Sequence, residues 1–250
     1  MITMFVETAQ GLGQILAKTL YTCIKGPYRD KEVFHHMYFM GIKSLPIITI
    51  STGFAGLVVT REIAYHMDLA LHSVEMIPGF SGQFVFRELG IAIPALFLVS
   101  KVGAATAAEI STMQVTEQID ALRLLQIDPV EYLVYPRFVA SVIVSASLIL
   151  ISIFVTLAAA IFVAVFKYNF SVLEYLNTLT HFISLKDLLW TLIKGMTFGG
   201  VIPIVSCYYG FQCKGGAEGV GHSTTNSVVT STILIIILDF ILTFAFSKLA

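Results

Sequence analysis

The stretch from Arg87 to Arg137, RELGIAIPALFLVSKVGAATAAEISTMQVTEQIDALRLLQIDPVEYLVYPR, decides the fold because its character changes twice. Residues 91–108 are almost entirely apolar, and their length is close to that of one membrane crossing. Residues 111–128 are polar and amphipathic, and they are too short and too charged to cross. After Arg137 the chain becomes apolar again. This pattern predicts a short amphipathic helix held between two membrane spans, as expected of a segment that meets a soluble partner at the membrane surface.

The composition of the 250-residue chain indicates an integral membrane protein. Hydrophobic residues make up 56% of it and charged residues 12%, whereas a soluble domain averages about 25% charged residues. So few charges leave too little polar surface to cover a soluble globule. The net charge of −1, without a basic tail, argues against a nucleic-acid partner. The cysteines and histidines show no metal-ligand spacing, so no metal site is predicted.

We expect an all-α fold in which one interfacial helix precedes five membrane spans. In residues 1–26, apolar or small side chains recur every three or four positions, which predicts a helix lying in the membrane interface. A soluble core helix is the alternative for this segment. Within a single transmembrane domain over residues 1–250, the expected spans are residues 44–65, 86–109, 134–166, 188–211 and 226–247.

Positive charge sets the expected orientation. The most basic part of the chain is residues 18–43, and by the positive-inside rule this side is cytoplasmic. Five spans then place the N-terminus in the cytoplasm and the C-terminus outside. The expected connections are a polar segment at residues 28–36, outer loops at 66–86 and 167–187, and a glycine-rich cytoplasmic loop at 212–225 with Ser223 or Thr224 capping the fifth span.

Residues 112–127 are predicted to form the short helix between spans two and three. Its apolar stripe consists of Val115, Ile119 and Leu122, and its charged side of Glu117, Asp120 and Arg123. Asp128-Pro129 is expected to cap and begin the next helix. An ordinary surface helix with a solvated charged face is the alternative. A docking role is favoured because the helix joins two spans with little flexible linker, so that a push on it would move both.

Three segments carry long and specific motifs. They are residues 87–90 (RELG), 101–137 (KVGAATAAEISTMQVTEQIDALRLLQIDPVEYLVYPR) and 215–243 (GGAEGVGHSTTNSVVTSTILIIILDFILT). These motifs resemble those of MlaE-type permeases, the membrane subunits of ABC transporters that move lipids. The resemblance implies a dimeric, non-catalytic permease of the bacterial inner membrane, carrying phospholipid and supporting outer-membrane lipid asymmetry or lipid trafficking. ATP and Mg²⁺ would be bound by a partner chain, so no cofactor is expected in this one.

The resemblance also implies partners. These are a second copy of the chain, a cytoplasmic ABC ATPase dimer, a periplasmic hexamer of MCE domains that binds the substrate and, in some systems, a STAS-domain protein on the ATPase. The ATPase would dock on residues 112–127, which thereby become a coupling helix with its N-terminal and C-terminal ends both cytoplasmic. The residues expected to face the ATPase are the polar Glu117, Gln118, Asp120 and Arg123, with Met113 and Leu122 as apolar anchors.

Arg87 and Glu88 are the candidate lipid-binding residues. By themselves they are expected to be charged residues at the border of the second span, with their charged ends at the membrane surface. The resemblance instead places them at the cavity of the dimer, where Arg87 could meet a phosphate with two hydrogen bonds and Glu88 could fix Arg87 or gate the exit. Asp239 and Lys194 are expected to be structural. An intramembrane carboxylate also suggests proton coupling, so an ion-coupled secondary transporter is the alternative function.

Overall fold

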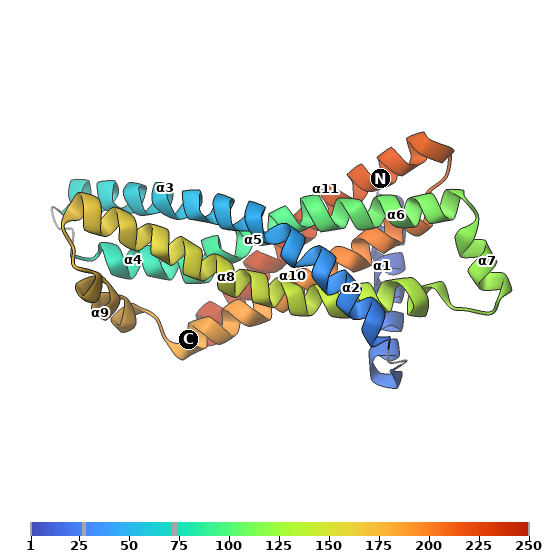
Figure 1. Cartoon of the computed structure of the whole chain (residues 1–250), viewed down its shortest axis with the longest axis horizontal. Helices are drawn as coiled ribbons and strands as arrows, with labels where there is room; N and C mark the ends of the chain where they lie inside the picture. Colours follow the sequence, from blue (N-terminus) through green and yellow to red (C-terminus); the bar gives the residue numbers. More distant parts are fainter. Residues whose placement is uncertain (1, 27–28, 72–74, 250) are drawn as a thin grey trace. The chain divides into compact units, whose positions relative to one another are not determined.

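The computed structural model describes residues 2–26, 29–71 and 75–249, and this part of the chain is helical with short turns and no strand. The all-α prediction is confirmed for these residues. Pro27, which follows the predicted interfacial helix, and residues 72–74 of the predicted outer loop lie outside the described residues. Figure 1 shows the order of the helices along the chain.

Within residues 2–26, 29–71 and 75–249, five helical segments are long and apolar enough to cross a membrane. They are Asp30–Leu69, Ile77–Val115, Val130–Tyr168, Leu185–Phe211 and Gly216–Lys248. Each of the five predicted spans lies within one of these segments, so the predicted number of spans is confirmed. The chain is therefore a multi-pass membrane protein.

Several of these segments are built from more than one helix. The helices are α1 (Ile2–Lys25), α2 (Asp30–Met40), α3 (Leu45–Leu71), α4 (Ile77–Phe84), α5 (Gly90–Leu98), α6 (Ala104–Val115), α7 (Gln118–Leu124), α8 (Tyr135–Tyr168), α9 (Val172–Phe182), α10 (Leu185–Phe211) and α11 (Gly216–Leu249). A 3-10 turn η1 (Ile42–Ser44) joins α2 to α3, and π-helical turns form η2 (Val85–Leu89), η3 (Val99–Gly103) and η4 (Val130–Val134).

The predicted connections are shorter than expected, because most of their residues are helical. The polar segment at 28–36 contributes to α2, and the outer loops at 66–86 and 167–187 contain α4 and α9. The glycine-rich loop shrinks to residues 212–215, since α11 begins at Gly216. Ser223 and Thr224 therefore lie inside α11 and do not cap it, which corrects the prediction.

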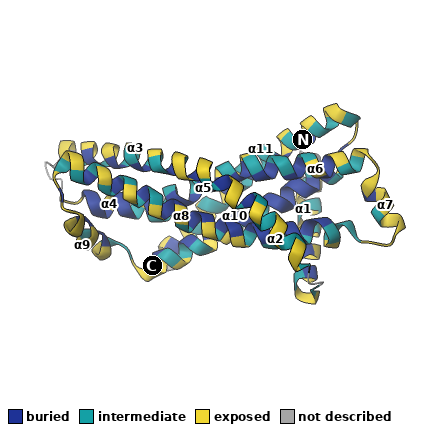
Figure 2. Ribbon diagram, viewed as in Figure 1, coloured by how far each residue is buried: buried dark blue, intermediate teal, exposed yellow. Residues whose placement is uncertain are grey.

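Packing explains why α4 and α9 form where loops were predicted. Ile77 of α4 and Tyr175 of α9 are fully buried in one apolar cluster. The Tyr175 hydroxyl also lies 2.8 Å from Ser81 Oγ, so its polar group has a partner inside that cluster. Figure 2 shows α4 largely buried, whereas many residues of α3 are exposed. Buried apolar area thus stabilises short helices whose sequences carry turn signals.

The chain divides into two compact units, each assembled from segments that are distant in sequence. Unit 1 consists of Met1–Ser44, Leu98–Ser145 and Met196–Leu238, and unit 2 of Leu45–Phe97, Ala146–Gly195 and Asp239–Ala250. The helices α8, α10 and α11 contribute residues to both units. The single domain over residues 1–250 stays a prediction.

The core of unit 1 joins α7 to the helices before and after it. Ile110 of α6, Ile119 of α7 and Cys207 of α10 are fully buried in one cluster. Leu12 and Ile15 of α1 pack against the same cluster. The predicted interfacial helix α1 and the short helix α7 therefore share one core, so a change in the position of either is felt by the other.

Candidate functional site

A group of charged side chains lies inside the apolar segments of unit 2, centred on Lys194. Only 4% of Lys194 is exposed. Its Nζ donates hydrogen bonds to Asp239 Oδ1 at 2.8 Å, to Thr243 Oγ1 at 2.7 Å and to the Arg87 carbonyl at 2.9 Å, and it lies 3.4 Å from Glu88 Oε1. Thr243 Oγ1 also donates to Glu88 Oε1 at 3.0 Å. The lysine of α10 is thus held by groups from η2 and α11.

A second ion pair in unit 2 adjoins the first through Arg87. Its Nε donates to Asp187 Oδ1 at 3.1 Å, and its guanidinium lies 5.1 Å from the centre of the Phe246 ring. Asp187 is buried, and its other oxygen accepts hydrogen bonds from the Ser184 amide and hydroxyl. The side chain of Arg87 remains 41% exposed. Part of the Arg87 side chain is therefore accessible from outside the group.

Arg87 and Glu88 occupy the π-helical turn η2, a helical distortion that is frequent at functional sites. Here the main-chain hydrogen bonds reach one residue further than in an α-helix, and the Arg87 carbonyl accepts from Lys194. Arg87 pairs with Asp187, whereas the sequence offered Glu88 either as the residue that fixes Arg87 or as a gate for the exit. Glu88 is held by Lys194 and Thr243.

The five charged side chains of this group, Arg87, Glu88, Asp187, Lys194 and Asp239, comprise three carboxylates and two cations. The gap that remains among them is about 20 Å³, which is room for roughly one water molecule. Charges taken out of water are stable only when they are paired and hydrogen-bonded. Each of the five side chains has a partner of opposite charge in this conformation, while Arg87 and Glu88 remain 41% and 31% exposed.

From the sequence, Lys194 and Asp239 were each expected to be structural, and no contact between them was predicted. The structure brings them together in the interior of their helices. The signal was available: a lysine and an aspartate in two different apolar spans are each costly alone, and pairing removes much of that cost.

The second candidate site is the connection between α6 and α8 in unit 1. The helix predicted over residues 112–127 is broken, because Glu117 adopts a left-handed conformation with φ of 59°. Residues 112–115 belong to α6, whose last turn is closed by a hydrogen bond from Thr116 Oγ1 to the Thr112 carbonyl. Only α7 remains as a separate short helix, which corrects the predicted bounds.

The predicted polar contact residues of this connection are all exposed: Glu117, Gln118, Asp120 and Arg123. Asp120 and Arg123 also pair with each other at 2.8 Å. The two predicted apolar anchors, Met113 and Leu122, instead pack against the core of unit 1. Both side chains are only partly buried there, so their role as apolar anchors stays a prediction.

The most exposed apolar side chains of the connection are Leu124 and Leu125, which sequence reasoning missed. Leu124 is 86% exposed and Leu125 is 70% exposed. Adjacent residues on a helix point about 100° apart, so two neighbouring leucines cannot both follow the buried stripe through Ile119 and Leu122. That geometry is the signal that could have found them. Figure 2 shows that α7 is largely exposed.

Two ion pairs hold the base of the α6–α7–α8 connection, and Arg137 is their one buried member. Arg137 of α8 is 3% exposed, and its Nη2 lies 2.8 Å from Oε1 of Glu109 on α6. Asp128 Oδ1 accepts a hydrogen bond from the Val130 amide at 3.0 Å, in agreement with its predicted capping role. Lys18 of α1 pairs with the other oxygen of Asp128 at 2.5 Å.

The chain thus combines five apolar spans with a group of paired charges from η2, α10 and α11, and with an exposed short helix between the second and third spans. This combination indicates a helical membrane protein of the transporter class. The family model described as Permease MlaE matches residues 33–245, and the chain belongs to this family. The matched region includes α7 and the residues around Lys194.

Relatives of the chain carry matching names. It is 37% identical over 234 residues to a probable ABC transporter permease protein of Rickettsia felis, covering 90% of this chain and 86% of the relative. It is 36% identical over 219 residues to one of Synechocystis, covering 88% and 83%, and 38% identical over 199 residues to one of Porphyra purpurea, covering 78% and 73%. The chain is a membrane permease subunit.

Proposed function

We propose that the chain is the permease of an ATP-driven lipid transporter, with phospholipid as its cargo. It works as a dimer in the bacterial inner membrane, its N-terminus is cytoplasmic and its C-terminus periplasmic, and ATP is hydrolysed by a partner chain. The observation that carries the proposal is α7, a short exposed helix rooted in the core and placed between two membrane spans. Membership of the MlaE permease family supports the same conclusion.

The ATPase docks on α7. Glu117, Gln118, Asp120 and Arg123 supply polar contacts, and the exposed Leu124 and Leu125 supply apolar area, as is usual for the centre of an interface. Ile119 is fully buried beneath this surface. Because the pair of Glu109 and Arg137 ties α6 to α8 at the base, a displacement of α7 by the ATPase reaches both spans.

The lipid head contacts Arg87 and Glu88. The Arg87 side chain is 41% exposed and its guanidinium is suited to a phosphate oxygen, while Phe246 beside it offers an apolar wall. The gap of about 20 Å³ cannot admit a headgroup, so loading requires the ionic group to open under the action of the ATPase. On the periplasmic side the lipid passes to or from an MCE-domain hexamer, and a STAS-domain protein regulates the ATPase where one is present.

The docking step is tested by replacing the exposed leucine of α7. Leu124→Asp removes apolar contact area without touching the core, because the side chain is 86% exposed. We expect at least a tenfold loss in affinity for the ATPase, or about 1.4 kcal/mol, together with loss of ATP-driven lipid transfer in proteoliposomes. Leu173→Asp, at a leucine of α9 that is 69% exposed, is the matched control. Normal ATPase binding and transfer in the Leu124 variant would refute the docking assignment.

A specific observation also favours a second function. The closed group of Lys194, Asp239 and Glu88 lies within membrane spans, where ionisable residues often mark ion or proton pathways. An ion-coupled secondary lipid transporter would use this group and need no ATPase. Proteoliposomes that hold the chain alone under an imposed proton gradient distinguish the two: gradient-driven lipid movement without ATP supports the second function and contradicts the first.

A further inference from the structure

Two cavities of unit 1 adjoin along α1 and differ in chemistry. The first, of about 760 Å³, is polar and lies among α1, the end of α10 and the start of α11. The second, of about 510 Å³, is apolar and is lined by the other side of α1 with α8, α10 and α11. Thr8 lines both cavities. Each volume lies in the range of about 300–1,000 Å³ that is usual for sites of small organic ligands.

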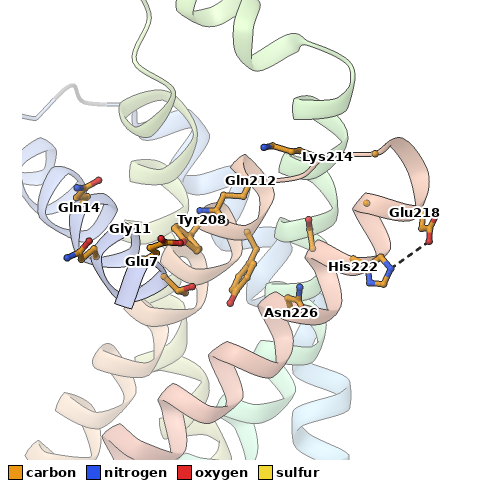
Figure 3. Close-up of a pocket in the computed structure, with 15 residues that line it drawn as sticks. Glu7, Gly11, Gln14, Tyr208, Gln212, Lys214, Glu218, His222 and Asn226 are labelled. Carbon is orange, nitrogen blue, oxygen red and sulfur yellow. Dashed lines mark ion pairs between the residues drawn. The ribbon is translucent and has the colours of Figure 1, made fainter. Parts of the chain in front are cut away.

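The polar cavity has a slight excess of negative charge. Its ionisable residues are Glu7, Lys214, Glu218 and His222, which sum to −1 with a neutral histidine. Figure 3 shows Glu7 close to Tyr208 at one side of the cavity, and the pair of Glu218 and His222 at the opposite side. His222 Nε2 lies 3.8 Å from Glu218 Oε1, so these two partly satisfy each other. Glu7 and Lys214 are left as the opposite charges available to a ligand with both a cation and an anion.

The apolar groove suits a hydrocarbon chain. Leu12 and Leu16 of α1 face Phe138 of α8 and Leu234 of α11 across it. The hydroxyl of Thr230, one of the few polar groups of the groove, forms a hydrogen bond with the Tyr209 hydroxyl at 2.8 Å. Glycine also keeps the groove open, since a Cβ added at Gly13 would meet nothing within 4 Å. A polar basin that continues into a groove of this kind is shaped for an amphiphile, one end charged and the other apolar.

We propose that the two cavities together bind one zwitterionic phospholipid of the cytoplasmic leaflet. Its ammonium faces Glu7 and the ring of Tyr208, its phosphate faces Lys214, and one acyl chain enters the groove beside Gly13. A purely anionic head is disfavoured by the negative balance of the basin. The proposal rests on the proposed function for the leaflet and for lipid as cargo. The site shares no residue with the group around Lys194, so it is a second and separate lipid-binding site.

The test is native mass spectrometry of the purified full-length chain after incubation with equal amounts of phosphatidylethanolamine and phosphatidylglycerol that carry the same acyl chains. We expect the wild type to retain phosphatidylethanolamine at least threefold more than phosphatidylglycerol. Gly13→Leu places a side chain in the groove and should lower retained lipid at least fivefold. Gly221→Leu is the matched control, because Gly221 is a helical glycine with equally open space that lines neither cavity.

Glu7→Gln tests the binding of the lipid headgroup in the polar cavity separately from the binding of the acyl chain in the apolar groove. It should leave lipid bound but abolish the preference for phosphatidylethanolamine. The proposal is overturned if Gly13→Leu retains as much lipid as Gly221→Leu, or if the preference survives Glu7→Gln. It is also overturned if Gly13→Leu changes only the ratio of monomer to dimer, which would make the groove a protein interface.

ATP-driven lipid transfer by the complex is measured in parallel, so that the two proposals fail separately. Loss of retained lipid in Gly13→Leu, with no ATP-driven transfer even by wild type, supports the binding site and refutes the proposed function. Normal transfer by wild type, with lipid retention that Gly13→Leu does not alter, refutes the binding site alone.

Discussion

Removal of the Lys194 side chain is the perturbation that the structure makes most informative. Lys194→Ala deletes a buried cation that contacts Asp239, Thr243, the Arg87 carbonyl and Glu88 at 2.7–3.4 Å. It leaves the carboxylates of Asp239 and Glu88 facing each other without their common partner. We expect a strong loss of stability, because an uncompensated buried charge is far more costly than a missing pair.

The size of the effect follows from the burial. Breaking a buried ion pair on one side costs about 3–5 kcal/mol, and for a protein of this size about 1 kcal/mol corresponds to roughly 2–4 °C in Tm. Lys194→Ala should therefore lower Tm by roughly 6–20 °C. The double variant Lys194→Leu with Asp239→Leu removes opposite charges together, so it should be more stable than Lys194→Ala by about 2 kcal/mol or more.

The chain contains its own reporter for this experiment. Trp190 is the single tryptophan, and it lines the gap beside Arg87 and Lys194 with its ring 5.6 Å from that of Phe246. Thermal unfolding followed by intrinsic fluorescence in detergent therefore reads the site directly. Lys186→Ala, at an exposed lysine near the start of α10, is the matched control and should leave Tm within about 1 °C.

Two results would refute the reasoning about Lys194. One is a Tm for Lys194→Ala within a few degrees of that for Lys186→Ala, which would mean that the ammonium is not a buried counter-ion. The other is a double variant less stable than Lys194→Ala, which would mean that the aspartate is held by other groups and does not depend on the lysine.

Three further predictions concern packing, backbone strain and pH. Gly199→Ala should destabilise the chain by about 1–3 kcal/mol, because the added Cβ would lie 1.9 Å from Ser145 Oγ. Gly221→Ala places its Cβ in open space within a helix, so it should stabilise the chain by about 0.5–1 kcal/mol. Measurement of Tm for the two variants tests both expectations. Glu117→Val should lower stability by about 1–3 kcal/mol, because the left-handed backbone there excludes β-branched residues, and Glu117→Gly should not; an equal Tm for both would contradict this. Burial raises the pKa of the Tyr175 phenol in the folded state. As the pH rises past the ordinary tyrosine value of about 10, the phenol therefore loses its proton first in the unfolded state, and the stability of the folded state falls. Tyr175→Phe should remove this alkaline loss of stability, measured as Tm between about pH 9 and pH 11.

The sequence predicted the helical class and the number of spans because both depend on long apolar runs. Residues 138–166 carry no charge, and such a run has few alternatives to a membrane helix. The loops were predicted less well. Turn signals at Pro78-Gly79 suggested a loop, but Ile77 and Tyr175 are buried together, so α4 forms through a contact between residues nearly a hundred positions apart. Local sequence does not encode such a contact.

The candidate sites were likewise predictable from the sequence only in part. Exposure of Glu117 and Arg123 followed from the helical period, since charged residues off the apolar stripe face solvent. The break at Glu117 did not, because a left-handed turn at a non-glycine residue leaves no clear pattern in the sequence. The partners of Lys194 depend on which faces of η2, α10 and α11 meet. Charge and burial cost predict that a partner exists, while only packing determines which residue it is.

The pair of Glu109 and Arg137 has a consequence for how this protein can change over evolution. Each side chain is secured chiefly by the other, and Arg137 also donates to the Leu133 carbonyl at 2.7 Å. Replacing Glu109 alone would leave the buried charge of Arg137 without its carboxylate beneath the α7 connection, whereas the side chain of Glu109 is itself 57% exposed. We therefore expect the two positions to co-vary among members of the family. They should either keep opposite charges or become neutral together, so that both residues are replaced as a pair.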